Sequence, residues 1–268
     1  MTKHSSTRTT IGIIGIGHLA QYLINGFRNR SSEIILKLYN RTYEKAAALK
    51  GSDANIHIVK SNQEAISNSD IVIIATRPKD VKVALSNTYF EKHQVLVCVA
   101  AGVTLVELNS LIKPAKAIRV LPISSVAINK SPILQYPHNK LAQELFSMVG
   151  NVHVLPNEEM LTPATAIVGA FYAWMFPLMN NIIQWGKENN IKEDLARELV
   201  IETIESATGM AIHQNNLDLN EIWKTLATPG GISELGMKSI QKSDGLNLWS
   251  NALGEVVKKM NQENEAKK

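Results

Sequence analysis

The sequence predicts an α/β fold, a doubly wound parallel sheet followed by an all-helical domain. Two observations predict it. Between residues 10 and 155, short runs rich in Ile and Val alternate with helical patterns, as in βαβ units whose helices cover both faces of a parallel sheet. After Pro156 the chain shows helical periodicity and no further strand-like run. We therefore place a domain boundary near residue 155, which gives domains of residues 1–155 and 156–268.

Each element of the first domain is predicted from its pattern of apolar residues. Strands are expected at residues 11–15, 34–39, 56–59, 70–76, 94–100 and 116–122, with helices at 18–27, 42–50, 61–67, 79–86 and 104–112. In the second domain, a helix is expected at 193–212, where Glu193 and Asp194 suit its N-terminus. Apolar residues spaced three and four apart predict another helix at 248–260.

The composition is that of a folded soluble protein, because 45% of the 268 residues are hydrophobic and 19% are charged. The net charge of +4 is modest and no run mixes Arg with aromatic residues, so we expect no nucleic-acid partner. The single cysteine, Cys98, excludes an intrachain disulfide and favours a reducing compartment. The first ten residues are polar and lack the apolar segment of a signal peptide. We expect a cytoplasmic protein.

An uncharged run extends from residue 160 to 186 and is long enough to span a bilayer. However, Pro163, Pro177 and Asn180 interrupt it, and positive flanking charge is lacking. A helix that is apolar on every side can equally be enclosed by protein. We expect no membrane association, and instead an obligate homodimer whose partner encloses this run, since a monomer rarely exposes so much apolar surface.

A glycine motif predicts a dinucleotide site directly after the first strand. Gly15 permits a tight turn, Gly17 lets the backbone approach a pyrophosphate, and Ala20 allows close packing of helix and strand. The N–H groups of His18 and Leu19 open the following helix and would meet the phosphates. The alternative is a glycine turn without a ligand, which the strand-turn-helix context disfavours.

The end of the second predicted strand favours NADPH as the cofactor. Enzymes that use NAD usually carry Asp or Glu there, to bind the ribose hydroxyls. This chain has Asn40, Arg41 and Thr42 instead. A guanidinium can hold a 2′-phosphate through two hydrogen bonds, so we predict NADPH, with NADH possible. The alternative is that Arg41 is a solvated surface charge.

Two further segments, "ATRPKD" and "VAAGVT", follow the fourth and fifth predicted strands. Open α/β sheets hold ligands at the carboxyl ends of their strands. The remaining cofactor-binding candidates lie in these segments: Ala75, Arg77, Pro78, Ala100 and Ala101. Small residues there would let a nicotinamide ribose lie against the backbone, although packing at strand ends explains them equally.

From about residue 10 to 258 the chain resembles the pyrroline-5-carboxylate reductase family. The resemblance lies in "GIIGIGHLA", "NRTYEKA", "DIVIIATRPKDV", "VAAGVTLVEL", "IRVLP" and above all "TPGGISELG". It implies a Rossmann-type NADP-binding domain followed by a helical dimerisation and substrate domain. It also implies a homodimer, in some members built into a ring of dimers, that reduces the cyclic imine 1-pyrroline-5-carboxylate to proline with NADPH.

In that family a Ser-Pro-Gly-Gly-x-Thr stretch begins a helix that receives the substrate carboxylate and faces the nicotinamide. The matching residues are Gly230, Gly231, Ile232 and Ser233, whose backbone N–H groups would bind the carboxylate. Ser233 takes the place of the family's Thr hydroxyl beside the ring nitrogen, and it is the candidate catalytic residue. We predict no metal, because acidic residues and histidines nowhere show metal-ligand spacing.

Three segments depart from the family pattern. Its Met-Pro-Asn-Thr-Pro loop reads "LPISS" at 121–125, its Ser-Gly-Ser-Gly-Pro stretch reads "VGAFY" at 168–172, and the usual Lys of its Val-Lys-Pro turn is Arg77. The bulky Phe171 and Tyr172 leave two alternatives open. One is a reductase of a different imine, and the other is a non-catalytic NADP-binding relative with a regulatory role.

A further alternative is a dehydrogenase of the β-hydroxyacid type, which also joins a nucleotide domain to helices. That family places a catalytic Lys on its first long interdomain helix. The corresponding run from Glu159 contains no Lys before Lys187, which disfavours this type.

Overall fold

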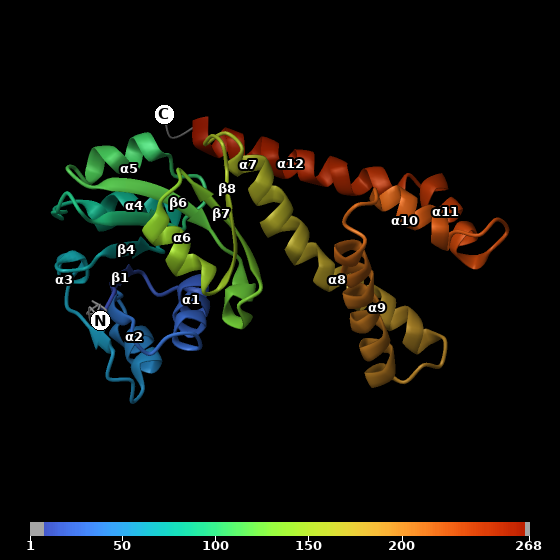
Figure 1. Cartoon of the computed structure of the whole chain (residues 1–268), viewed down its shortest axis with the longest axis horizontal. Helices are drawn as coiled ribbons and strands as arrows, with labels where there is room; N and C mark the ends of the chain where they lie inside the picture. Colours follow the sequence, from blue (N-terminus) through green and yellow to red (C-terminus); the bar gives the residue numbers. More distant parts are fainter. Residues whose placement is uncertain (1–7, 266–268) are drawn as a thin grey trace, which may run out of the picture. The chain divides into compact units, whose positions relative to one another are not determined.

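The computed structural model describes residues 8–265, so residues 1–7 of the polar N-terminal segment lie outside the described part. The chain forms two compact units. Of the described residues, 8–168 and 260–265 form one unit and 169–259 form the other (Figure 1). The predicted domain boundary near 155 falls just after the last strand, and where the domains divide in solution stays a prediction.

The first unit is built on an eight-stranded sheet of order β3-β2-β1-β4-β5-β6-β7-β8. The strands are β1 (Thr10–Ile14), β2 (Ile35–Tyr39), β3 (Ile56–Ile58), β4 (Ile71–Ile74), β5 (Val95–Cys98), β6 (Lys116–Leu121), β7 (Ser131–Tyr136) and β8 (Gly150–Val154). Strands β1 to β6 pair in parallel, which confirms the predicted doubly wound sheet. Strand β7 runs antiparallel to β6, and β8 is parallel to β7.

Helices cover both faces of this sheet. Because successive residues of a strand point to opposite faces, each face has its own buried cluster. Ile13 belongs to one buried cluster, and the next residue, Ile14, belongs to the other. On the first face, Phe27 and Phe146 meet edge to face with ring centroids 5.8 Å apart. The helices of this unit are α1 (His18–Arg28), α2 (Tyr43–Lys50), α3 (Asn62–Ile66), α4 (Pro78–Leu85), α5 (Leu105–Leu111), α6 (Lys140–Ser147) and α7 (Leu161–Thr165).

Strands β7 and β8, and helix α6 between them, were missing from the predicted elements. In β7 the run "SPILQY" is interrupted by Pro132 and by Gln135, which is polar although fully buried. Strand β8 lies at the edge of the sheet and exposes Asn151 and His153. Neither strand therefore has the continuous Ile and Val pattern by which the six parallel strands were recognised.

The second unit is all-helical, as predicted. Its helices are α8 (Tyr172–Glu188), α9 (Glu193–His213), α10 (Leu219–Leu226), α11 (Ile232–Lys242) and most of α12 (Gly245–Glu265). The predicted helices at 193–212 and 248–260 lie within α9 and α12. The Lys187 ammonium at the end of α8 lies 2.6 Å from the Glu193 carboxylate at the start of α9, and this hydrogen bond lowers the pKa of Glu193.

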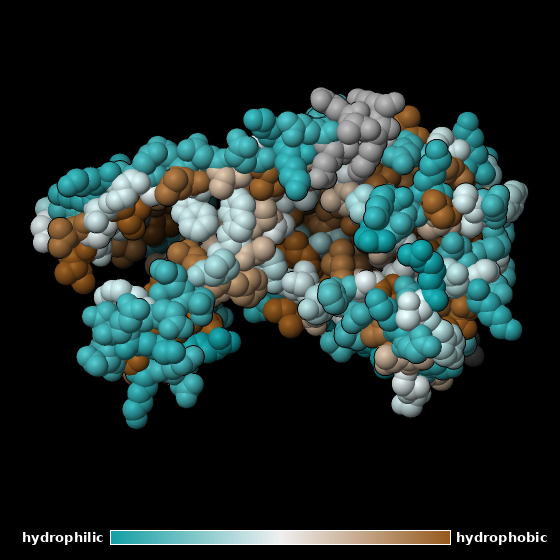
Figure 2. Space-filling view, turned by 180° about the vertical axis from the view of Figure 1, so that it is seen from behind, coloured by the Kyte–Doolittle hydropathy of each residue, from teal (hydrophilic) through white to brown (hydrophobic). Residues whose placement is uncertain are grey.

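The uncharged run forms α7, a π-helical segment from Ala166 to Phe171, and α8. By length and composition alone, the helical stretch Leu161–Glu188 could cross a membrane. Only 11% of its most apolar 18-residue segment is buried within the single chain. Large apolar side chains such as Phe176 and Trp185 are exposed, and Figure 2 shows hydrophobic side chains gathered along the helices. Surface of this kind is typical of a protein interface.

Candidate functional site

The glycine-rich turn after β1 has a geometry that a side chain would disturb. Gly15 has a φ of +90°, and a Cβ placed on it would lie 2.7 Å from Cγ2 of Thr76. Its N–H donates to the carbonyl of Tyr39 at 2.9 Å, which fixes the turn against the end of β2. A Cβ on Gly17 would meet nothing closer than the Ala75 carbonyl at 4.0 Å. The space above Gly17 is therefore open to a ligand.

Beside this turn lies a cavity of about 450 Å³ at the carboxyl ends of β1, β2 and β4. The predicted cofactor residues that line it are Gly15, Gly17, Asn40, Arg41, Ala75 and Arg77. Those outside its lining are His18, Thr42 and Pro78, which adjoin lining residues in the chain, Leu19, which is two residues from Gly17, and Ala100 and Ala101, which follow β5. A larger cavity of about 620 Å³ elsewhere in this unit contains none of the predicted site residues.

Helix α1 presents unpaired amide groups beside this cavity. Its first intrahelical hydrogen bond runs from Gln21 N–H to the Gly17 carbonyl at 3.1 Å. The N–H groups of His18 and Leu19 precede this bond, so they have no partner within the helix. The start of a helix is favourable for an anion, and a pyrophosphate fits this position.

The residues after β2 have two different roles: Asn40 stabilises the glycine turn, and Arg41 and Lys45 supply positive charge. Asn40 braces the turn, because its Oδ1 accepts the Ile16 N–H at 2.9 Å and its Nδ2 donates to the Thr42 carbonyl at 2.9 Å. Arg41 and Lys45 both line the cavity, and neither has a carboxylate partner among the described residues. These two free cations would attract a phosphate.

Arg77, by contrast, is engaged within the chain. Its Nε lies 2.9 Å from Oδ2 of Asp80, one turn into α4, and both residues line the cavity. Because the guanidinium already has a carboxylate partner, Arg77 is a weaker candidate for the phosphate than Arg41.

Two polar residues of the cavity, Asn62 and Thr76, were absent from the predicted site. The Nδ2 of Asn62 donates to the Ala84 carbonyl at 2.8 Å, whereas its Oδ1 is buried without a partner. The Thr76 Oγ1 is also buried and unpartnered. Buried polar atoms are nearly always satisfied, so these two fit a bound group with hydrogen-bonding atoms of its own. The residues present therefore suit a phosphorylated dinucleotide.

The predicted substrate segment begins α11, in the second unit. Gly231 is the N-cap, and Gly230 before it has a φ of +75°. The first intrahelical bond runs from Leu235 N–H to the Gly231 carbonyl at 3.1 Å, so the amides of Ile232 and Ser233 precede it. The Ser233 side chain is exposed, and none of the described residues hydrogen-bonds to it. These groups are free to meet a carboxylate and a ring nitrogen.

Glu234 is a neighbour of this segment that sequence reasoning missed. Its Oε2 accepts the Gly230 N–H at 2.9 Å, and its Oε1 lies 2.8 Å from the Lys238 ammonium. The hydrogen bond from Lys238 and then that from Gly230 lower the pKa of Glu234, so it is ionised at neutral pH. Two of the amides predicted to bind the substrate carboxylate are therefore already paired, that of Gly230 with this carboxylate and that of Gly231 with the Thr228 carbonyl at 2.9 Å. The four-residue spacing from Gly230 to Glu234 was the available signal.

The two bulky residues of the altered 168–172 stretch belong to aromatic contacts within the second unit. Phe171 meets Trp249 edge to face with centroids 6.1 Å apart, and Tyr172 meets Phe176 in the same way at 5.3 Å. Trp174 also lies beside Trp249, at 6.2 Å. Bulky aromatic side chains thus occupy the segment where the family has hydroxyls, glycines and a proline. We call Phe171, Tyr172 and Trp249 the aromatic wall.

Comparisons with protein families support this organisation. A model described as NADP oxidoreductase coenzyme F420-dependent matches residues 10–102. A second, described as pyrroline-5-carboxylate reductase dimerisation, matches residues 158–263. The chain is similar to the pyrroline-5-carboxylate reductase family, whose dimerisation model covers most of its second half. The resemblance inferred from the sequence is thereby confirmed, together with its order of a Rossmann-type domain and a helical dimerisation domain.

Individual members of the family match almost the whole chain. Pyrroline-5-carboxylate reductase 1 of Bacillus spizizenii is 26% identical, with 93% of this chain and 87% of the relative covered. The Pseudomonas aeruginosa reductase is 25% identical, with 94% and 98% covered. The crystal structure of Plasmodium falciparum pyrroline carboxylate reductase with NADP bound superposes with a TM-score of 0.83 at 20% identity, over 96% of this chain and 98% of that one.

Within residues 8–265, no group of His, Cys, Asp and Glu side chains could hold a metal ion. Cys98 is buried at the end of β5, and burial raises the pKa of its thiol to about 11. The thiolate is the nucleophilic form of cysteine, so at neutral pH we assign Cys98 a packing role.

Proposed function

We propose that the chain is an NADPH-dependent reductase that converts 1-pyrroline-5-carboxylate to proline by hydride transfer to a cyclic C=N bond. The observation that carries the proposal is the cavity beside Gly17, where a ligand can approach the backbone closely. Two cations that are unpaired among the described residues, Arg41 and Lys45, and two unpartnered buried oxygens, Asn62 Oδ1 and Thr76 Oγ1, could bind a phosphorylated dinucleotide there. The carboxylate of the substrate would lie on the amides at the start of α11. Named family members that match nearly the whole chain support this reaction.

Little acid–base apparatus is required by this chemistry, because the imine reacts in its N-protonated form and hydride transfer to the carbon of that iminium gives the secondary amine directly. NADPH supplies the hydride when it is bound. The chain's part is orientation. The α1 amides and Arg41 hold the cofactor, and the amides of Ile232 and Ser233 fix the substrate carboxylate. The Ser233 hydroxyl hydrogen-bonds the ring nitrogen, so that the imine carbon presents one face to the cofactor.

Turnover tests the proposal directly. Purified protein supplied with NADPH and 1-pyrroline-5-carboxylate should lose absorbance at 340 nm and form one proline for each NADPH consumed. Tight NADPH binding without consumption, with this or any other small cyclic imine, would favour the non-catalytic alternative.

A different imine is the second candidate substrate, and the aromatic wall of Phe171, Tyr172 and Trp249 favours it. Aromatic side chains bury large apolar area, so a bulkier cyclic imine would gain contacts that pyrroline-5-carboxylate lacks. A larger kcat/KM for an aryl-substituted cyclic imine than for pyrroline-5-carboxylate would establish it.

We propose a homodimer as the functional assembly, located in the cytoplasm and without a membrane partner. The dimerisation model that matches residues 158–263 supports the homodimer, as do the exposed apolar side chains of the second unit. Larger rings would be built from this dimer.

Arg41→Ala should weaken NADPH binding about 10-fold or more while leaving NADH binding within about twofold. The physical reason is that a charge-assisted hydrogen bond contributes about 1.5–3 kcal/mol, and only NADPH carries the 2′-phosphate. Titration of cofactor fluorescence measures both dissociation constants. Arg30→Ala, at an exposed arginine outside the cavity, is the control. An equal increase in the dissociation constants of NADPH and NADH would show that Arg41 does not bind the 2′-phosphate.

Glu234→Ala should lower the KM for a carboxylate-bearing imine, by up to about fivefold, the range of an exposed charge pair. The substitution frees the Gly230 N–H, removes a negative charge beside the carboxylate site and leaves Lys238 unpaired. Lys238→Ala removes the opposite charge from the same pair and should raise that KM. Steady-state kinetics with NADPH saturating decide between them, and a KM raised in both variants would contradict the proposed carboxylate site.

A further inference from the structure

A partly buried ion pair lies in the first unit, outside the lining of the nucleotide cavity. Arg119, in the middle of β6, places its Nη1 3.1 Å from Oε1 of Glu158. The arginine side chain is 8% exposed and the glutamate 27%. Glu158 belongs to the segment between β8 and α7, so the pair joins two parts of the chain that are 39 residues apart.

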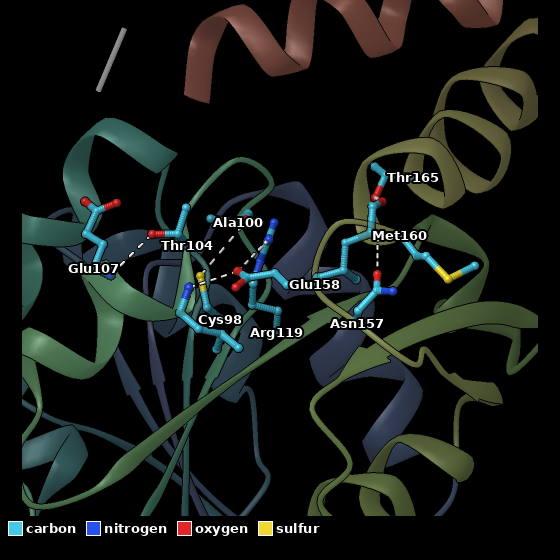
Figure 3. Close-up of polar contacts among 11 residues, drawn as sticks. Cys98, Ala100, Thr104, Glu107, Arg119, Asn157, Glu158, Met160 and Thr165 are labelled. Atoms are coloured by element: carbon cyan, nitrogen blue, oxygen red, sulfur yellow. Dashed lines mark hydrogen bonds and ion pairs between the residues drawn. The ribbon is translucent and has the colours of Figure 1, made fainter. Parts of the chain in front are cut away.

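The same carboxylate oxygen has a second partner. Oε1 of Glu158 also accepts the N–H of Leu105 at 2.9 Å. Leu105 is the first residue of α5 and follows the loop from Val99 to Thr104 that leaves β5. Figure 3 shows Glu158 between Arg119 and this loop, where Ala100 and Thr104 are labelled. One oxygen thus ties the end of the loop to the neighbouring strand.

Stability alone is a poor explanation of this arrangement. Burying a guanidinium and a carboxylate costs free energy that their attraction only partly offsets. The cost is larger here because the Nε of Arg119 is buried without a partner. Thr104 already caps α5 through its hydroxyl, which accepts the Glu107 N–H at 3.2 Å. Glu158 satisfies the N–H of Leu105, which Thr104 leaves unpaired, and because its own chain segment is distant it also fixes the position of the loop before α5.

That loop belongs to the nicotinamide half of a doubly wound fold. Such folds join two mononucleotide-binding halves and bind the dinucleotide across the carboxyl ends of the strands. The glycine turn, Arg41 and Asn62 belong to the first half, on β1 to β3. Ala100 and Ala101 follow β5, in the second half.

We propose that Arg119 and Glu158 are positioning residues for the nicotinamide half of the cofactor. They hold the 99–104 loop so that the nicotinamide ribose lies against Ala100 and Ala101, while the adenosine half is bound independently of them. This inference rests on the proposed NADPH-dependent function.

The experiment compares two ligands on one variant. Glu158→Ala should weaken NADPH binding about 10-fold, measured by cofactor fluorescence. Binding of adenosine 2′,5′-bisphosphate, which represents the adenosine half alone, should stay within about twofold by calorimetry. Glu158→Gln keeps an oxygen that can accept the Leu105 N–H and should restore most of the NADPH affinity. Glu158→Asp shortens a partly exposed side chain and should give an intermediate loss, which provides a second variant if the Ala protein does not fold.

Asp53→Ala is a matched control in the same unit. Its carboxylate also pairs with an arginine, Arg28 Nε at 2.8 Å, and also accepts a backbone amide, Asn55 N–H at 2.9 Å. It lies in the turn before β3, at the amino end of that strand, whereas the cofactor cavity lies at the carboxyl ends of the strands. This variant should lose thermal stability as Glu158→Ala does and bind NADPH as the unsubstituted chain does.

The outcomes separate the inference from the function on which it rests. If the unsubstituted chain does not bind NADPH, both are overturned. If it binds NADPH, and Glu158→Ala binds both ligands as tightly as before or weakens both equally, the positioning role is wrong and the proposed function stands.

Discussion

Gly15→Ala should reduce NADPH affinity by more than about 100-fold. The added Cβ would lie 2.7 Å from Cγ2 and 3.0 Å from the backbone nitrogen of Thr76, at a φ of +90°. A strained conformation of this kind costs about 1–3 kcal/mol. The chain would relieve it by moving the turn, which carries the amides that meet the pyrophosphate. Because Thr76 lies in the same cavity, the displacement would also alter the nucleotide site.

Gly51→Ala is the control for this prediction. Gly51 also has a positive φ, of +49°, but nothing lies within 4 Å of a Cβ placed on it, and it does not line the nucleotide cavity. The control should lose some stability in thermal unfolding and retain its NADPH affinity. Cofactor titration of both variants, with circular dichroism to verify folding, makes the comparison. Undiminished binding by a folded Gly15→Ala protein would show that the turn does not hold the dinucleotide.

Ser233→Ala has the second-largest expected effect, a fall in kcat of about 100-fold. Removing one pre-positioned hydrogen-bonding group at a reacting centre typically costs about 10² to 10³ in kcat, and Ser233 is the proposed partner of the ring nitrogen. NADPH affinity should be unchanged, because the nucleotide cavity lies in the other unit. Single-turnover measurement at 340 nm with saturating substrate separates the hydride step from binding.

Ser233→Thr serves as the conservative variant. It restores the hydroxyl of the family pattern and adds a methyl group that restricts the χ1 rotamer. Activity should equal or exceed that of the unsubstituted chain. If the Ala variant turns over as fast as the Thr variant, the hydroxyl has no part in the reaction and the amides of α11 alone orient the substrate.

The parallel part of the sheet could be predicted because its strands are buried on both faces and read as continuous Ile and Val runs. Strands β7 and β8 could not, since Pro132 and Gln135 interrupt one and the other is exposed at the sheet edge. The glycine turn and Arg41 were predictable because the motif is local in the chain. In each of these features, the residues that determine the structure lie within a few positions of each other in the chain.

Other parts of the site depend on distant packing. The unpartnered oxygen of Asn62 arises because α3 packs where its amide meets the Ala84 carbonyl, 22 residues away. Arg119 and Glu158 meet only once β6 and the segment after β8 are folded together. No spacing rule in the sequence connects such pairs. Glu234, by contrast, lies only four residues after Gly230, so its contact with the Gly230 N–H is accessible to local reasoning.

A crystal structure of the protein with NADPH and proline tests the central claim most directly. That claim is that the helix beginning at His18 holds the hydride donor and the helix beginning at Ile232 holds the acceptor. We predict that the proline carboxylate lies on the amides of Ile232 and Ser233, with its ring carbon about 3.5 Å from nicotinamide C4. Proline bound elsewhere, or a cofactor that no pairing of subunits brings within reach of α11, would contradict it.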